Sequence, residues 1–208
     1  TIRTASGSHS SGDVSLKTGT AVDSSTGDIE IGTGHSFGFA GDIHVNVGKG
    51  QSSVGGSIDI SAGDMTMAET LLEEQDSANG GNVRITSGAS DKGNSGNVHI
   101  QSDSQRSGGR SGTVKLTTGD TLNSPSGDID ISSGASTESS GGDISIIVGS
   151  GRSGNSGNVN IRGGTAGEGY GGSVELLSGS GVETGAIVVG SASGSSSGTA
   201  SLLTGSAI

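Results

Sequence analysis

Residues 142–161 read GDISIIVGSGRSGNSGNVNI, and this stretch decides the expected fold. A glycine opens it, a small polar residue follows, and the apolar side chains of Ile144 and Ile146 flank the polar Ser145. A polar, glycine-rich run then leads to the same pattern at Gly157. Alternation of this kind indicates an extended segment with one buried face, and the run after it indicates a turn-rich return.

The same motif recurs along the whole chain, with some degenerate copies. Its opening glycines are Gly12, Gly27, Gly41, Gly56, Gly81, Gly96, Gly112, Gly127, Gly142, Gly157, Gly172, Gly185 and Gly198. Their successive spacings are 15, 14, 15, 25, 15, 16, 15, 15, 15, 15, 13 and 13 residues, and such a period is typical of a repeat architecture. Positions in each motif are numbered from this glycine, so the alternating apolar side chains occupy +2 and +4.

This pattern predicts an all-β fold, a parallel β-solenoid (β-helix or β-roll) of about 13–14 rungs with about 15 residues per rung. Residues 1–208 would form one continuous solenoid segment of a longer repeat protein. The apolar residues would stack inside, and the polar residue at +3 would face solvent. The residue before each opening glycine is small, as a tight corner requires. Asp, Asn, Ser or Thr at +1 would cap turn N–H groups and stack into polar ladders.

The spacing of 25 residues between Gly56 and Gly81 marks an insertion, placed at residues 64–80. Ala68 to Gln75 is the only good helix-forming stretch, so we expect a loop or short helix that projects from the rod. The basic side chains that follow at +3 would repel one another if stacked, and we hypothesise that an acidic residue of the insertion lies over them and compensates them. These basic residues are Arg84, His99 and Lys115, and the acidic candidates are Glu69, Glu73, Glu74 and Asp76. The alternative is a solvated loop with no specific partner.

Composition excludes several classes of protein. Only 27% of the residues are apolar and 1% aromatic, while glycine supplies 43 residues, so an ordinary globular core is not expected. A net charge of −11 with ten basic residues argues against a nucleic-acid partner. Without cysteine there are no disulfides, and no apolar run is long enough to predict a membrane span.

Several motifs imitate functional sites, and we interpret each as structural. Gly149 to Gly154 spells G-x-G-x-x-G, but another strand and not a helix would follow, so no nucleotide is expected. The expected outward neighbours Glu30, His44 and Asp59 would lie on a convex exposed face, which does not support acid–base catalysis. Calcium bound by Asp13, Asp28 and Asp42 is the alternative to backbone capping by the same carboxylates. The sequence therefore predicts no catalytic, cofactor-binding or metal site and no enzyme.

Some of these motifs resemble known families. Gly142-Asp143-Ile144-Ser145-Ile146 and Gly157-Asn158-Val159-Asn160-Ile161 are similar to repeats of Gly/Ser-rich cell-surface proteins of diatoms and other stramenopiles, and more weakly to filamentous haemagglutinin-type adhesins. Gly81-Asn82-Val83-Arg84-Ile85 resembles the repeat of grass antifreeze β-rolls. These resemblances imply an extracellular or cell-surface fibre, wall or adhesive component, or an ice binder.

The expected function is mechanical: a stiff extracellular filament, surface appendage or wall fibre that self-associates into filaments or lateral bundles. Ile147, Leu177 and Leu203, at an outward position, are candidates for lateral contacts. Two alternatives remain open. One is an ice-binding protein, and the other is an adhesin stalk that binds acidic polysaccharide through Arg84, His99 and Lys115 or through the insertion.

Overall fold

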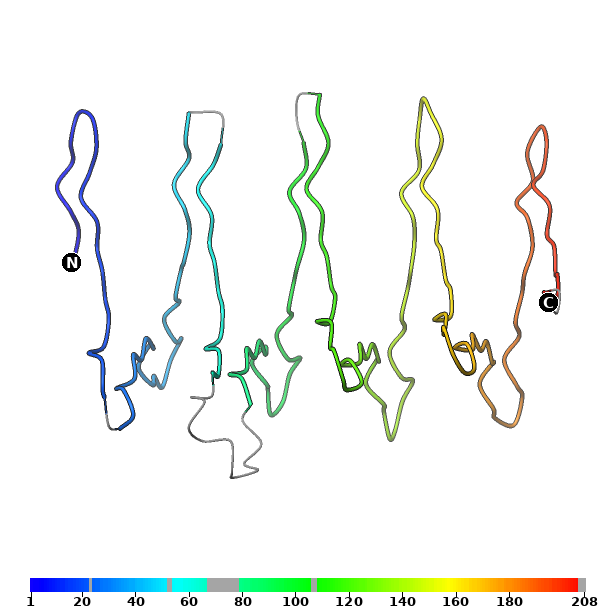
Figure 1. Ribbon diagram of the computed structural model, residues 1–208, viewed down its shortest axis with the longest axis horizontal. Helices are drawn as coiled ribbons and strands as arrows, with labels where there is room; N and C mark the ends of the chain where they lie inside the picture. The colour runs from blue at the N-terminus through cyan, green and yellow to red at the C-terminus, as the bar shows by residue number, and fades with distance from the viewer. Residues whose placement is uncertain (23, 52–53, 67–78, 106–107, 206–208) are drawn as a thin grey trace. The chain divides into compact units, whose positions relative to one another are not determined.

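The computed structural model describes residues 1–22, 24–51, 54–66, 79–105 and 108–205. Within these ranges the backbone forms neither helix nor strand, and Figure 1 draws it as a plain trace with bends at its turns. The chain divides into two units, Thr1–Val114 and Lys115–Ile208, of which the second begins inside the motif that Gly112 opens. No helix of the described residues is long and apolar enough to cross a membrane.

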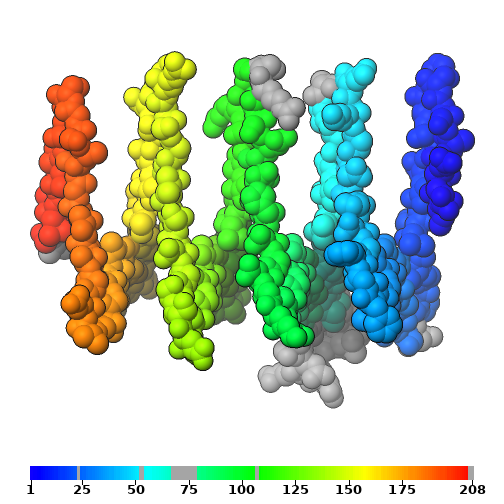
Figure 2. All heavy atoms as spheres, turned by 180° about the vertical axis from the view of Figure 1, so that it is seen from behind, coloured from blue at the N-terminus to red at the C-terminus, as the bar shows by residue number. Residues whose placement is uncertain are grey.

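The described residues form no buried core. No residue among them is buried, and the large apolar side chains of the motifs are 39% exposed or more. The surface area is 21825 Å², whereas a folded monomer of this mass exposes about 8,700 Å² and an unfolded chain about 29,000 Å². On the face that Figure 2 shows, much of the described chain appears as narrow columns of atoms.

A recurring contact, which we call the clasp, joins most motifs to the next. The side chain at +6 of one motif lies near the opening glycine of the following motif, at the base of the polar return between them. At Gly172 the neighbouring atoms are instead those of the Gly164 backbone, and Gly198 has no such neighbour. A Cβ on the glycine would lie close to the +6 side chain, 2.6 Å from Val47 Cγ1 at Gly56 and 2.8 Å from Val148 Cγ1 at Gly157. At Gly27 the corresponding distance, to Thr18 Cγ2, is 3.7 Å. At Gly56 and Gly157 this close approach leaves no room for a side chain, whereas the distance at Gly27 is that of an ordinary van der Waals contact.

Backbone hydrogen bonds reinforce several clasps. Among the described residues five backbone–backbone hydrogen bonds form outside regular structure, and each runs from an opening glycine N–H to the carbonyl of the glycine that ends the preceding motif. They are Gly81 to Gly63 (2.9 Å), Gly96 to Gly88 (2.9 Å), Gly142 to Gly134 (3.4 Å), Gly172 to Gly164 (2.9 Å) and Gly185 to Gly179 (3.1 Å). A folded domain makes about one internal hydrogen bond per residue, so most backbone groups of the described residues are left to solvent.

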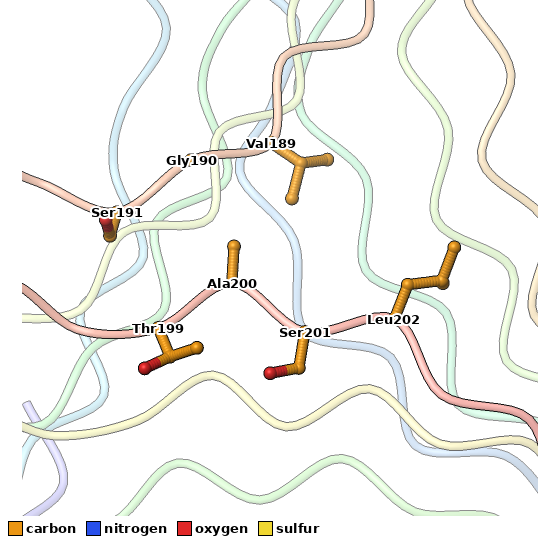
Figure 3. Close-up of a pocket in the computed structure, with 7 residues that line it drawn as sticks. All are labelled: Val189, Gly190, Ser191, Thr199, Ala200, Ser201 and Leu202. Atoms are coloured by element: carbon orange, nitrogen blue, oxygen red, sulfur yellow. The ribbon is translucent and has the colours of Figure 1, made fainter.

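The prediction of an all-β parallel solenoid is therefore wrong for the described residues. Parallel rungs need a ladder of hydrogen bonds between successive extended segments, and the bonds that form lie only at the bases of the returns. The chain runs in opposite directions in two neighbouring segments, Val189–Ser191 and Thr199–Leu202 (Figure 3). Here the return reverses the chain and does not close a coil, so the alternation of apolar residues does not produce stacked rungs.

Serine side chains shape three of the returns. Ser36 Oγ accepts a hydrogen bond from the Gly38 N–H (3.0 Å), Ser90 Oγ from the Gly93 N–H (2.9 Å) and Ser136 Oγ from the Ser139 N–H (3.0 Å). Such short-range bonds are the reason that serine favours turns. Two glycines in other returns, Gly108 (φ 71°) and Gly169 (φ 100°), adopt the left-handed conformation that glycine permits.

Candidate interaction surface

The two apolar positions of the motif differ in exposure in a regular way. The +2 side chains lie near half exposure, as in Ile129 (48%) and Ile144 (53%). The +4 side chains two residues later are more exposed, as in Ile131 (70%) and Ile146 (73%). Across the first twelve motifs the +4 values run from 60% to 79%. We call these side chains the +4 set: Leu16, Ile31, Val45, Ile60, Ile85, Ile100, Leu116, Ile131, Ile146, Ile161, Leu176 and Val189.

A hollow near the end of the second unit shows how the +4 side chains are presented. It has a volume of about 600 Å³ and is lined by Val189–Ser191 and Thr199–Leu202. In Figure 3 the side chains of Val189, Ala200 and Leu202 project into the space between the two segments, whereas Thr199 and Ser201 point away from it. A Cβ on Gly198 would have no atom within 4 Å, so the clasp is open here. The apolar side chains therefore line a space that the chain itself does not fill.

The +3 side chains are exposed, like the apolar side chains beside them, and they do not assemble into a reactive site. Glu30, His44 and Asp59 are all exposed, and the charged neighbour of His44 is Asp42, two residues away on the same motif (Nε2 to Oδ2, 3.8 Å). Both side chains of this pair are more than 80% exposed, and water weakens an ion pair of this kind. The arrangement does not provide the enclosed pocket that acid–base catalysis needs.

The basic residues at +3 are exposed and fall in different units. Arg84 and His99 belong to the first unit and Lys115 to the second, and His99 Nε2 lies 2.8 Å from the Oε1 atom of Gln101. The four acidic residues expected to compensate them, Glu69, Glu73, Glu74 and Asp76, lie outside the described residues. That hypothesis stays untested.

The insertion lies between two glycines that form a closed clasp. Residues 64–80 lie between Gly63 and Gly81, whose backbone groups form a 2.9 Å hydrogen bond. Residues 67–78, which contain the expected helix-forming stretch, lie outside the described residues. The extra sequence is thus added within a return and leaves the clasp beneath it in place.

The residues of the other candidate sites, for a metal ion and for a nucleotide, do not assemble into a site either. Within the described ranges no three His, Asp or Glu side chains come close enough to hold a metal ion, and this includes Asp13, Asp28 and Asp42. None of these three carboxylates caps a turn N–H among the described hydrogen bonds, so the expected polar ladder at +1 is not seen. In the G-x-G-x-x-G stretch the Gly151 N–H donates to Ser156 Oγ (3.2 Å), and no helix follows.

Exposed apolar residues also lie outside the +4 set. Ile147, Leu177 and Leu203, the candidates for lateral contacts, are 85%, 79% and 88% exposed. The return after Gly34 carries an aromatic pair, in which the rings of His35 and Phe37 meet edge to face with centroids 5.6 Å apart. The sequence reasoning missed the clasp, although its signal was present: position +6 carries mostly Ser, Thr, Ala or Val.

Comparison with known proteins found no family that matches the sequence, no curated protein similar to it and no solved structure similar to it. The resemblances to algal surface repeats, adhesins and antifreeze β-rolls therefore stay sequence-based hypotheses.

Proposed function

We propose that this chain is a structural repeat protein of the cell surface or extracellular space, not an enzyme, and that it works by associating with copies of itself. The observation that carries the proposal is the +4 set, twelve apolar side chains that recur at one position and are 60–79% exposed. A single exposed apolar residue needs no explanation, but a periodic set of them indicates an interaction surface.

A second copy of the chain fits this surface better than an unrelated partner. The surface repeats with the spacing of the motifs, so only a partner with the same spacing can cover many +4 side chains at once. A second copy has the same sequence and therefore the same spacing, and each additional motif that pairs adds to the free energy of association.

The area available is also large enough. The chain exposes 21825 Å², about 13,000 Å² more than a folded monomer of its mass. A stable protein interface buries about 1,200–2,000 Å² in total. Covering a fraction of the excess would therefore sustain an assembly, and burial of apolar area contributes about 25 cal/mol per Å².

The test is sedimentation velocity of the full chain over a range of concentrations from about 1 to 200 μM, together with electron microscopy. We expect species larger than the 19.9 kDa monomer that increase with concentration, and elongated particles. A chain that stays monomeric over the whole range contradicts the proposal. The matched variant carries Thr at all twelve +4 positions and is expected to stay monomeric, because Thr retains the β-branched shape but lacks the apolar surface.

A further inference from the structure

The motifs form a longer repeat of six, which becomes visible once the clasps are known. Gly12 and Gly112 open motifs 100 residues apart, as do Gly27 and Gly127. The next pairs, Gly41 with Gly142 and Gly56 with Gly157, are 101 residues apart. One of these pairs agrees closely: residues 27–31 read GDIEI and residues 127–131 read GDIDI.

The clasps repeat with the same register. Valine occupies +6 only in the motifs of Gly41 and Gly142, where Val47 and Val148 make the closest side-chain approaches to a following glycine. One motif later, the +6 residues Ala62 and Gly163 are both partly shielded, unlike nearly all other described residues.

The return that carries the insertion has a shorter counterpart in the second copy of this longer repeat. Gly81 donates to the Gly63 carbonyl and Gly172 to the Gly164 carbonyl, both over 2.9 Å. The return between Gly63 and Gly81 corresponds to the shorter return between Gly164 and Gly172. Among the described residues two pairs of bonds recur six motifs apart, Gly81–Gly63 with Gly172–Gly164 and Gly96–Gly88 with Gly185–Gly179, whereas the Gly142–Gly134 bond has no counterpart at Gly41.

The boundary between the two units coincides with this repeat. The first unit ends at Val114 and the second begins at Lys115, within the motif that starts the second copy. Each unit consequently contains six members of the +4 set, from Leu16 to Ile100 in the first and from Leu116 to Val189 in the second, and the thirteenth motif adds Leu202 to the second unit.

We propose that each unit is a complete docking surface for a second copy of this chain, so that one chain binds two others. This inference rests on the proposed self-association and specifies its valency. A chain with one such surface would form closed dimers, whereas a chain with two equivalent surfaces propagates into an open-ended assembly.

The experiment uses full-length variants in which only one unit loses its surface. The second-unit variant carries Leu116→Thr, Ile131→Thr, Ile146→Thr, Ile161→Thr, Leu176→Thr and Val189→Thr, and the first-unit variant carries Thr at Leu16, Ile31, Val45, Ile60, Ile85 and Ile100. These side chains are exposed, and the clasps are left unchanged. A control variant carries Ile147→Thr, Leu177→Thr and Leu203→Thr, which removes exposed apolar side chains outside the +4 set.

We expect the wild type and the control to form open-ended assemblies, while each one-unit variant stops at twice the monomer mass. Added to the wild type at equal concentration, a one-unit variant should act as a chain terminator and reduce the mean assembly mass at least twofold. One-unit variants that grow like the wild type, or a wild type that stops at a dimer, overturn the two-surface inference while leaving self-association intact. A wild type that stays monomeric overturns the proposed function itself.

Discussion

The N–H of Gly172 donates a 2.9 Å hydrogen bond to the carbonyl oxygen of Gly164 and thereby closes the return between them. A Cβ on Gly172 would lie 2.9 Å from the Gly164 backbone nitrogen, whereas a Cβ on Gly164 would meet nothing within 4 Å. Because neither glycine has a left-handed φ, alanine suits the backbone at both positions. The two glycines thus provide a matched pair of substitutions that differ mainly in steric conflict.

We expect Gly172→Ala to open this clasp and Gly164→Ala to leave it closed. An exposed backbone hydrogen bond contributes about 1 kcal/mol, so loss of the bond should raise the exchange rate of the residue-172 amide about fivefold. Amide exchange measured by NMR checks this expectation. Equal exchange rates in the two variants would show that the close approach to Gly164 does not hold the return.

The contact between Val148 and Gly157 predicts a rescue. Gly157→Ala places a methyl group 2.8 Å from Val148 Cγ1, so one partner must move. Val148→Ala removes the conflicting Cγ atoms, and the double variant should recover the close approach that Gly157→Ala alone disrupts. Nuclear Overhauser effects between residues 148 and 157 measure the approach. A double variant that resembles Gly157→Ala alone would contradict a steric origin for the glycine.

The insertion at 64–80 should be exchangeable for the shorter return of the other unit. Its base is the Gly81–Gly63 hydrogen bond, which has the same length as the Gly172–Gly164 bond. We expect replacement of residues 64–80 by the sequence of residues 165–171 to leave the exchange rate of the Gly81 amide within about twofold of the wild type. The assembly size should also stay unchanged. A large increase in exchange would mean that the inserted residues themselves hold the clasp.

Added salt should strengthen self-association. The chain carries a net charge of −11, so copies repel one another at low ionic strength. Raising the salt from 0.1 M to 1 M shortens the Debye length from about 10 Å to about 3 Å and screens this repulsion, while apolar contacts persist. Sedimentation in 0.1 M and 1 M sodium chloride tests the expectation. Weaker association in high salt would indicate that ion pairs, and not the +4 set, join the copies.

The chain should have no effect on ice growth. Ice recognition requires a flat, regular and weakly charged face, whereas the exposed +3 positions carry charged and titratable residues such as Glu30, His44 and Arg84. We expect thermal hysteresis no greater than that of an unrelated acidic protein at the same concentration. Faceted ice crystals in the presence of the wild type would instead support the ice-binding alternative.

The repeated motif can be identified from the sequence. The opening glycines, the alternating positions and the insertion are all evident from spacing. The exposure of the polar +3 side chains does not distinguish them, because the apolar +2 and +4 side chains are exposed as well. The six-motif repeat was also present in the sequence, although it becomes apparent only when Val47 is seen to correspond to Val148.

The arrangement of the motifs could not be predicted in the same way. Alternation of apolar residues reports that a segment is extended, but it does not report whether the next segment runs in the same or the opposite direction. That direction depends on how the return folds. The fold of a return depends on small contacts such as that of Thr18 with Gly27 and on single hydrogen bonds such as the one from the Gly38 N–H to Ser36 Oγ. The expected solenoid failed at this step, and with it the expectation of buried +2 and +4 columns.

Each clasp joins residues that are close in the sequence, and this has a consequence for biosynthesis. Closing a ten-residue loop takes about 10–100 ns, whereas a ribosome adds about 5–20 residues per second. The return from Gly88 to Gly96 can therefore close long before the next opening glycine, Gly112, has been added to the chain. A nascent chain of any number of motifs would emerge with its clasps already closed. The gain or loss of one motif would not disturb the others.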